Sequence, residues 1–329
     1  MIPVWYRLSD TPTLEFANQQ AGLATELTML IQILYYIFRY TIGAVPRRSQ
    51  FKIPQTIEKV SFASTVIIDL QKQTATKVYT PSKAVRTLYW IAFQAKYPYS
   101  SNLAALIAAK YRRDVAGRLT LHQFHREVVA PIIDITPIGT WFGLRSQLVI
   151  GDEVARDDES QRFLTEVAAF FDATGLPVWQ INPNSPTAYG NLIKTPQGYK
   201  IIDLESGVPS PTPITGSWRR TVEAGFVPMF DDIDFYRLRD YIAHNQDSLI
   251  ASFGQDWVSR LNSDVDSLEL ATRLWKSGER RLWGRCLSWL YRRCAGVGQN
   301  RDVAAKTPTR QISESVRIQE SENKPGRRS

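Results

Sequence analysis

Strand-like and helix-like segments alternate in a fixed order along the chain, and this order restricts it to few folds. Two runs rich in β-branched residues, VSFASTVIIDL and TATKVYT, are separated by a polar turn at Gln71-Lys72-Gln73. A helical pattern follows, with Ser101 or Asn102 as its N-cap and Gly117 near its end. The runs VVAPIIDI and TWFGLRSQLVI are again typical of strands. The pattern predicts an α+β protein.

The second half of this pattern begins with an amphipathic helix and ends in a hairpin. The segment DESQRFLTEVAAFFDATG places five apolar residues on one helical face: Phe163, Leu164, Val167, Ala168 and Phe171. The hairpin NLIKTPQGYKIIDLESG, residues 191–207, turns at Gln197-Gly198, and its apolar second strand ends in Asp203 and Glu205. Such an end is either a capped surface hairpin or a place for hard oxygen ligands of Mg²⁺. Further helices are expected from about Phe235.

The order of these elements resembles that of the protein-kinase-like superfamily. The motif IIDLES is similar to variants in aminoglycoside-phosphotransferase-like, choline-kinase-like and lipopolysaccharide-kinase-like enzymes. The resemblance implies a bilobal fold, with a small β-rich N-lobe over residues 51–150 and a mostly helical C-lobe over residues 151–296. An N-terminal helical extension is expected over residues 1–50. Residues 297–329 are polar and without periodicity, which predicts a disordered tail.

The same resemblance implies a nucleotide site. Lys77 stands in the place of the third-strand lysine that binds the α and β phosphates of ATP. Asn191 and Asp203 stand in the places of two Mg²⁺ ligands. Glu205 is a further metal ligand or a structural partner. The implied cofactors are ATP and Mg²⁺.

Two parts of the expected site depart from the usual pattern. The loop that covers the phosphates corresponds to SFAST and has no glycine, although Ser61 and Ser64 are small and supply hydroxyl donors. The helix after the third strand has no glutamate to pair with Lys77. The acids available are Asp114 in that helix and Glu127 just beyond it, and we expect Asp114 in preference.

The expected catalytic base is missing. Five residues before Asn191, where the resemblance places an aspartate, stands Pro186. The loop WQINPNSPTAYGN has neither aspartate nor histidine, and the amides of Asn182 and Asn184 cannot accept a proton as a base. Phosphoryl transfer depends mostly on positioning and electrostatics, so the missing base lowers the rate without forbidding the reaction. The sequence therefore predicts a nucleotide-binding protein that is a weak phosphotransferase or a pseudokinase.

The charge of the chain favours an anionic partner. The formal net charge is +8 and the isoelectric point is about 9.4. The segment TRLWKSGERRLWGRCLSWLYRRC, from Thr272 to Cys294, carries seven lysines and arginines against one acid, Glu279. This pattern is typical of a membrane-surface helix, and equally of a C-terminal helix that packs its tryptophans onto the domain. An alternative function is therefore a non-catalytic scaffold that binds an anionic membrane or a protein partner through this helix. Nucleic acid ranks last, because no stacking platform accompanies the charge.

The chain shows features of a cytoplasmic protein with peripheral membrane contact. Cys286 and Cys294 would lie roughly 12 Å apart on one helix, too far for a disulfide, which favours a reducing compartment. No cleavable signal peptide is visible. The apolar segment Leu23–Gly43 is interrupted by Glu26 and Arg39, and the residues between them span about 18 Å as a helix, against roughly 30 Å of bilayer core. A buried helix is expected first, an interfacial helix second and a spanning helix last.

Other candidate sites carry less. His122 and His125 lie three residues apart but lack accompanying cysteines or carboxylates, so surface or packing histidines are expected. The run MFDDIDF holds Asp231, Asp232 and Asp234, which would either face a substrate or form an acidic cluster at a helix N-terminus. Neither the P-loop pattern nor the serine-hydrolase pattern occurs.

Overall fold

The computed structural model describes residues 53–278, except 54, 62, 84–85, 88, 90–96, 209 and 211–215. The chain divides into two compact units, Met1–Ser288 and Trp289–Ser329, and every described residue belongs to the first. Three predictions therefore lie outside the described residues: the helix over Leu23–Gly43, the part of the basic helix beyond Gly278 and the disordered tail.

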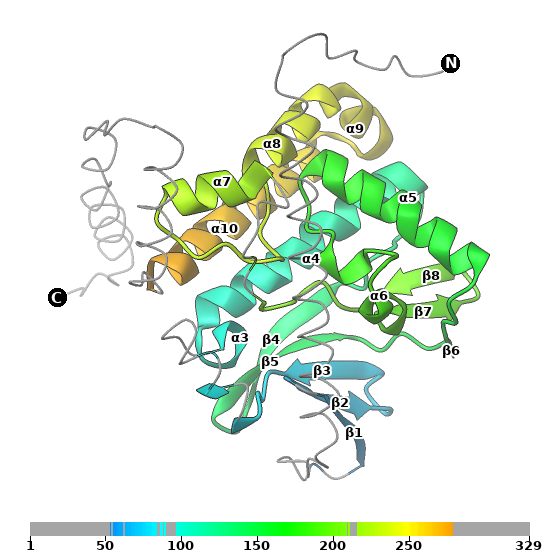
Figure 1. Cartoon of the computed structure of the whole chain (residues 1–329). Coiled ribbons are helices and arrows are strands. Elements are labelled where there is room, and N and C mark those ends of the chain that lie inside the picture. The colour runs from blue at the N-terminus through cyan, green and yellow to red at the C-terminus, as the bar shows by residue number, and fades with distance from the viewer. Residues whose placement is uncertain are drawn as a thin grey trace, which may run out of the picture. The chain divides into compact units, whose positions relative to one another are not determined.

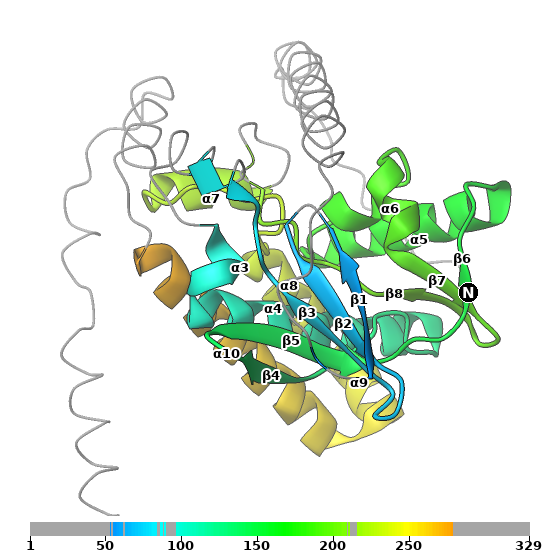
Figure 2. The ribbon, with the colours of Figure 1, turned by 90° about the horizontal axis from the view of Figure 1, so that it is seen from below.

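The protein is a mixed α+β structure with a five-stranded antiparallel sheet and helices elsewhere (Figure 1). The strand order in this sheet is β1-β2-β3-β5-β4, and Figure 2 shows the strands side by side. The strands are β1 (Thr56–Val60), β2 (Thr65–Asp69), β3 (Thr74–Val78), β4 (Ile132–Ile138) and β5 (Trp141–Gln147). All four predicted strand-like runs are confirmed, as is the turn at Gln71–Gln73. This turn joins β2 to β3, and Gln73 supplies a positive φ of 52°.

A second, smaller sheet has the order β6-β7-β8. Its strands are β6 (Asp152–Glu153), β7 (Leu192–Thr195) and β8 (Gly198–Ile201). The predicted hairpin is thus confirmed, with Gly198 at a φ of 100°, where glycine is strongly favoured. A side chain at Gly198 would also meet the Arg126 guanidinium, which donates to the carbonyl oxygens of Gln197 and Tyr199. The turn is therefore tied to the segment that precedes β4.

The longest helix next to the large sheet is α4 (Leu103–Phe124), preceded by the short α3 (Pro98–Ser101). Asn102 is its N-cap, and its side chain accepts hydrogen bonds from Ala104 N and Ala105 N. The expected end near Gly117 is wrong. A single glycine costs only about 1 kcal/mol inside a helix, and the helix ends where His125 adopts a left-handed conformation. Figure 1 shows α4 between the large sheet and α10.

The predicted amphipathic helix is α5 (Asp158–Thr174). Asp157 and Ser160 form a reciprocal capping box at its start, and Gly175 ends it in a left-handed conformation. Of the predicted apolar face, Phe163, Leu164, Val167 and Phe171 are buried and Ala168 is partly buried. The remaining described helices are η1 (Trp179–Ile181), α6 (Pro186–Gly190), α7 (Gly216–Glu223), α8 (Phe235–His244), α9 (Gln246–Phe253) and α10 (Gln255–Gly278).

Helix α10 packs along α4, so the start of the basic segment follows the second of the two interpretations, that of a helix packed onto the domain. Residues 272–278 of that segment are the last turns of α10. Trp275 is 1% exposed and packs against Tyr99, with ring centroids 5.6 Å apart. Lys276 is also buried, and its ammonium donates to Asp232 Oδ2 at 2.7 Å and to Val227 O at 3.0 Å. Lys276 therefore does not add to a basic surface.

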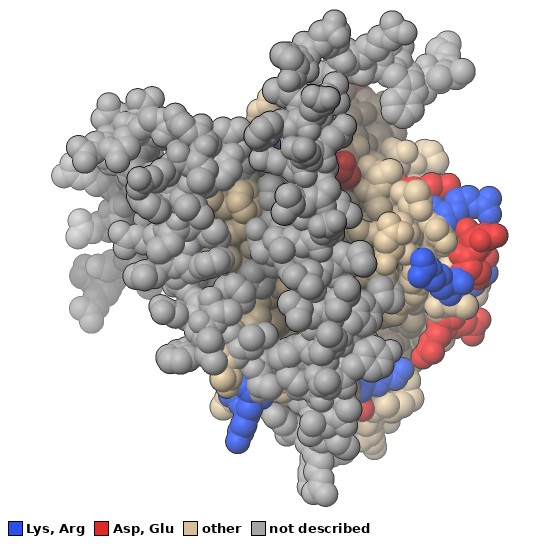
Figure 3. All heavy atoms as spheres, viewed as in Figure 1, with Lys and Arg blue, Asp and Glu red and all other residues tan. Residues whose placement is uncertain are grey.

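The part of the chain that the structure describes contains no helix long and apolar enough to cross a bilayer. On the face in Figure 3, most of the described charged side chains lie at the right edge, where both signs are mixed, and a further basic group lies at the lower left.

Candidate functional site

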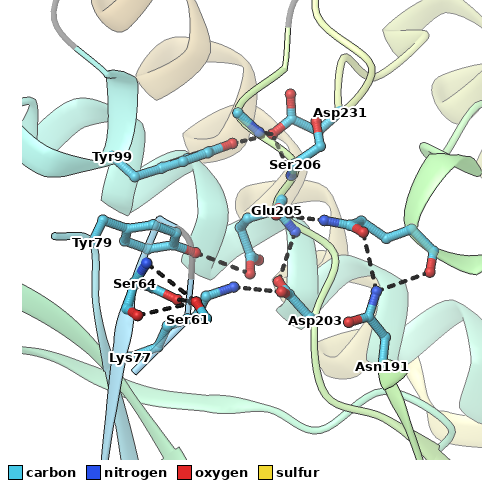
Figure 4. A network of polar contacts seen from close by, with 12 residues as sticks. Ser61, Ser64, Lys77, Tyr79, Tyr99, Asn191, Asp203, Glu205, Ser206 and Asp231 are labelled. Atoms are coloured by element: carbon cyan, nitrogen blue, oxygen red, sulfur yellow. Dashed lines mark hydrogen bonds and ion pairs between the residues drawn. The ribbon is translucent and has the colours of Figure 1, made fainter. Parts of the chain in front are cut away.

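Lys77 is presented by the middle strand of the large sheet. In β3 it lies opposite Val66 of β2 and Leu144 of β5, so its backbone is held from both sides. Its side chain is 16% exposed and its ammonium lies 4.9 Å from the centre of the Tyr79 ring. The ammonium forms an ion pair with Asp203 Oδ2, a residue 126 positions further along the chain (Figure 4). The ammonium of Lys77 and the carboxylate of Asp203, far apart in the sequence, are therefore in contact.

Asp203 reaches this position because the end of β8 is anchored on both edges. Ile201 exchanges backbone hydrogen bonds with the segment before β4, to Val128 O at 2.7 Å and from Ala130 N at 2.9 Å. Ile202 N donates to Asn191 O at 2.9 Å. Beyond these bonds the chain turns, and Asp203 Oδ1 accepts from the backbone N–H of Glu205 at 3.1 Å. The apolar strand thus carries the carboxylate to the ammonium of the other sheet.

Burial and charge oppose each other at Asp203. Its surroundings disfavour the ionised form, and this burial raises the pKa of Asp203. The Lys77 ammonium acts in the other direction, as does Arg113, whose Nη2 lies 3.7 Å from Asp203 Oδ1. A carboxylate in this position gains much from contact with a cation such as a lysine ammonium or a metal ion.

Glu205 is a buried partner of Arg113. It is 3% exposed, and both of its oxygens accept from Arg113 of α4, at 3.0 Å from Nε and 2.6 Å from Nη2. Tyr79 OH donates to the same carboxylate at 3.4 Å. Burial opposes ionisation of Glu205, but the Arg113 charge and hydrogen bonds outweigh it and lower the pKa of Glu205 well below its usual range. The pairing with Arg113 agrees with the structural role, the second of the two alternatives predicted for Glu205.

The acid expected beside Lys77 is not Asp114. Asp114 forms an ion pair with Lys110 one helical turn earlier, and Glu127 forms one with Lys200 of β8 at 3.4 Å. Neighbouring residues in a helix point about 100° apart, so Asp114 turns away from the face that carries Arg113. Lys77 is paired by Asp203 instead. The prediction that Asp114 pairs with Lys77 at the cofactor site is therefore wrong.

The sequence interpretation missed the two adjacent arginines of α4. Arg112 and Arg113 are each about 2% exposed, and each faces an acid of the C-terminal half. The helical period contained a signal, because positions 112 and 113 lie one turn from buried residues on either side, Ala108, Ala109 and Ala116. Two arginines on an otherwise apolar stripe predict buried partners of opposite charge.

The aspartates at positions 231, 232 and 234 form structural hydrogen bonds and ion pairs. Asp231 Oδ2 accepts from Tyr99 OH and, at 3.3 Å each, from the backbone N–H groups of Ser206 and Gly207. Arg112 lies 3.6 Å from the same oxygen. Asp234 caps α8 by accepting from Arg237 N at 3.2 Å, which confirms the helix N-terminal explanation for that residue. The segment after Asp203 is therefore held by buried groups.

Ser61 and Ser64 lie in the loop between β1 and β2, as predicted. Their hydroxyl oxygens are 2.8 Å apart, and Ser61 N donates to Ser64 O at 2.7 Å. Figure 4 shows this tight loop on the same side as the Lys77 ammonium. The serine hydrogen bonds take the place of glycine in closing the loop, and they leave small side chains beside the lysine.

Asn191 stands at the start of the hairpin, where α6 ends and β7 begins. Its side-chain Nδ2 donates to Gln180 O at 3.1 Å and to Gln180 Oε1 at 3.0 Å. In Figure 4 its amide oxygen points toward the side of Asp203. The residues that could hold Mg²⁺ are therefore Asn191 and Asp203. Two protein oxygens fit a Mg²⁺ ion whose other ligands are phosphates and water.

A metal site made by the protein alone is not evident. Across the described part of the chain, no three His, Cys, Asp or Glu side chains gather as a metal-binding group. His122 contacts the Ser248 hydroxyl at 3.1 Å and the ring of Phe253, which agrees with the packing role expected for it. Any metal held by Asn191 and Asp203 would thus depend on oxygens brought by a ligand.

The chain was compared with family models, curated proteins and solved structures, and none of them matches it.

Proposed function

We propose that the protein is a kinase-like nucleotide-binding protein that binds ATP with Mg²⁺ and transfers phosphate weakly or not at all. In this proposal the fold is bilobal and protein-kinase-like. The five-stranded sheet belongs to an N-lobe that ends near Ile150, and the β6-β7-β8 sheet with the later helices belongs to a C-lobe that begins at Gly151. The strand order and the position of α4 between β3 and β4 support this assignment.

The observation that carries the proposal is the ion pair between Lys77 and Asp203. Lys77 lies in β3 of the large sheet and Asp203 just beyond β8 of the small one, and both side chains are only partly exposed, so each would be costly to leave unpaired. A polyphosphate with Mg²⁺ offers each group a partner of the correct sign, namely a phosphate oxygen for the ammonium and the metal for the carboxylate. Ligand binding would therefore exchange one ion pair for two favourable contacts.

The chemistry expected of the site is binding rather than fast transfer. Mg²⁺ would bridge phosphate oxygens and neutralise their charge when bound. The segment from η1 to Asn191 supplies no carboxylate or imidazole to accept the proton of an attacking hydroxyl. The nearby acids are engaged elsewhere, Glu205 by Arg113 and Asp231 by Tyr99 and Arg112. Because these acids are already paired, a pseudokinase or a weak phosphotransferase is favoured over an efficient kinase.

Millimolar ATP with Mg²⁺ is expected to raise the Tm of the full-length protein. A ligand at about one hundred times its Kd adds about 2.7 kcal/mol to the free energy of unfolding. For a protein of 329 residues that corresponds to roughly 4 °C. Asp203→Ala should abolish the shift, measured against the Tm of the ligand-free variant, because the metal then loses its carboxylate.

Glu159→Gln is the matched control, since it removes an exposed ion pair with Lys194 of β7. This variant should keep the full ATP-dependent shift. The proposal is contradicted if the wild-type protein shows no shift, or if Asp203→Ala is stabilised by ATP as strongly as the wild type.

A further inference from the structure

Gln180 contacts Asn191 and the segment just after Asp203, although no sequence pattern singled it out. It lies in η1, and its side-chain amide has one donor end and one acceptor end. The acceptor end, Oε1, receives Asn191 Nδ2 at 3.0 Å, and the donor end, Nε2, donates to Glu205 O at 2.7 Å. One side chain thus links the start of the hairpin to the segment that follows Asp203.

These bonds determine which way the Asn191 amide faces. Its nitrogen carries two protons, and two oxygens of Gln180 accept from that nitrogen. Turning the Asn191 amide over would place its oxygen against both acceptors and leave them without a proton. The amide oxygen of Asn191 is therefore directed away from Gln180, toward the side of Asp203 in Figure 4.

The orientation of Gln180 is fixed in turn. Turning its amide over would place Oε1 against the carbonyl oxygen of Glu205, and Nε2 against the Nδ2 of Asn191. The Glu205 carbonyl is itself a firm reference point, because the Glu205 side chain is buried and bound by Arg113 through two hydrogen bonds. The order of dependence runs from Arg113 to Glu205, then to Gln180 and then to Asn191.

We propose that Gln180 is a positioning residue for the metal, which presents the Asn191 oxygen beside Asp203 and so creates a two-ligand Mg²⁺ site. This inference rests on the proposed nucleotide binding, because phosphate oxygens and water complete the coordination. Residues behind the metal ligands that fix ligand orientation typically change metal affinity about 10–100-fold when mutated. Gln180 acts through Asn191 and does not touch the metal.

The test compares the affinity for ATP in Mg²⁺ with the affinity in EDTA, measured by isothermal titration calorimetry on the full-length protein. Gln180→Leu should reduce the Mg²⁺-dependent gain in ATP affinity by about 10–100-fold. The Kd for ATP in EDTA should stay within about twofold of the wild-type value, since Lys77 is untouched. A merely structural role would weaken binding equally in both conditions.

Two further variants complete the design. Asn191→Leu should lose the same gain, and the double variant should be no worse than Asn191→Leu alone, because both changes remove one ligand. Asn182→Ala is the matched control in the same loop. Its side chain accepts only from Asn184 N at 2.9 Å among the described contacts, so the Mg²⁺-dependent gain should persist. Gln180→Ala replaces Gln180→Leu if the latter does not fold.

The outcomes separate the two proposals. If Mg²⁺ strengthens ATP binding equally in the wild type and in Gln180→Leu, the positioning role is wrong while nucleotide binding stands. The same conclusion follows if wild-type ATP binding does not respond to Mg²⁺. If the wild-type protein binds ATP in neither condition, the proposed function fails and the positioning role fails with it.

Discussion

Arg113→Leu is expected to lower the free energy of unfolding by about 3–5 kcal/mol, measured by urea denaturation at neutral pH. The substitution leaves the Glu205 carboxylate buried without the guanidinium whose positive charge balances it. Removing one partner of a buried pair costs far more than the pair contributes, because the remaining charge has lost both water and its counter-ion. We expect the lost stability to appear in the global unfolding transition, since Arg113 joins α4 to the segment after β8.

Two comparisons make this prediction specific. Lys110→Met removes a partly exposed ion pair with Asp114 on the same helix and should cost only about 0.3–0.5 kcal/mol. The double variant Arg113→Leu with Glu205→Leu should recover much of the loss, because an apolar pair of similar volume leaves no buried charge. Equal losses for Arg113→Leu and Lys110→Met would show that Arg113 is not buried against Glu205.

The same pair gives the sign of a pH dependence. Folding lowers the pKa of Glu205, so its contribution is present above the unfolded value of about 4.3 and is lost as the pH falls toward the folded value. The difference in free energy of unfolding between the wild type and Arg113→Leu should therefore be largest at neutral pH and become smaller as the pH falls below about 4.3.

Trp275→Ala is expected to lower the free energy of unfolding by about 3–5 kcal/mol, which urea denaturation measures as well. Trp275 lies in α10, is 1% exposed and packs against the buried ring of Tyr99. Its removal leaves a cavity between α10 and Tyr99 of α3 that the surrounding side chains fill only in part. The size of the loss distinguishes a core tryptophan from one held ready for a membrane surface.

Leu270→Ala is the matched control, because Leu270 lies on the same helix and is 54% exposed. Its loss should stay below about 1 kcal/mol, as is usual for surface substitutions. A loss at Trp275 as small as that at Leu270 would contradict the position of α10 and would restore the view that this tryptophan is free to meet a partner.

Much of the fold could be predicted from local patterns. The strands around Lys77, the capping by Asn102 and the hairpin from Asn191 to Asp203 follow from β-branched runs, cap residues and turn residues. These signals depend only on residues close in the sequence, so they can be recognised without knowing the tertiary structure. The meeting of Lys77 with Asp203 could not be derived that way, since it joins two sheets, and it was expected only because the order of elements resembles kinase-like proteins.

The errors arose where a side chain is defined by its tertiary neighbours. Asp114 was chosen for its charge, but the helical rotation of one residue brings Arg113 to the site instead. The sequence also counts Lys276 among the basic residues of a surface helix, because nothing near it in the sequence shows that it pairs with Asp232 in the interior. Gln180 carried no signal at all, since its role arises only when η1, the hairpin and Glu205 come together.

The central claim is that Lys77 faces the phosphates of a bound nucleotide, and a labelling experiment tests it most directly. In an acyl-phosphate derivative of ATP, a lysine amine beside the phosphates attacks the acyl carbon, an amide forms and ATP leaves. Mass spectrometry should find Lys77 acylated in preference to Lys59 and Lys72 of the same sheet region, although Lys72 is far more exposed. An excess of ATP should suppress the label at Lys77 alone. Labelling that follows solvent exposure, with Lys77 unmodified or insensitive to ATP, would contradict the account.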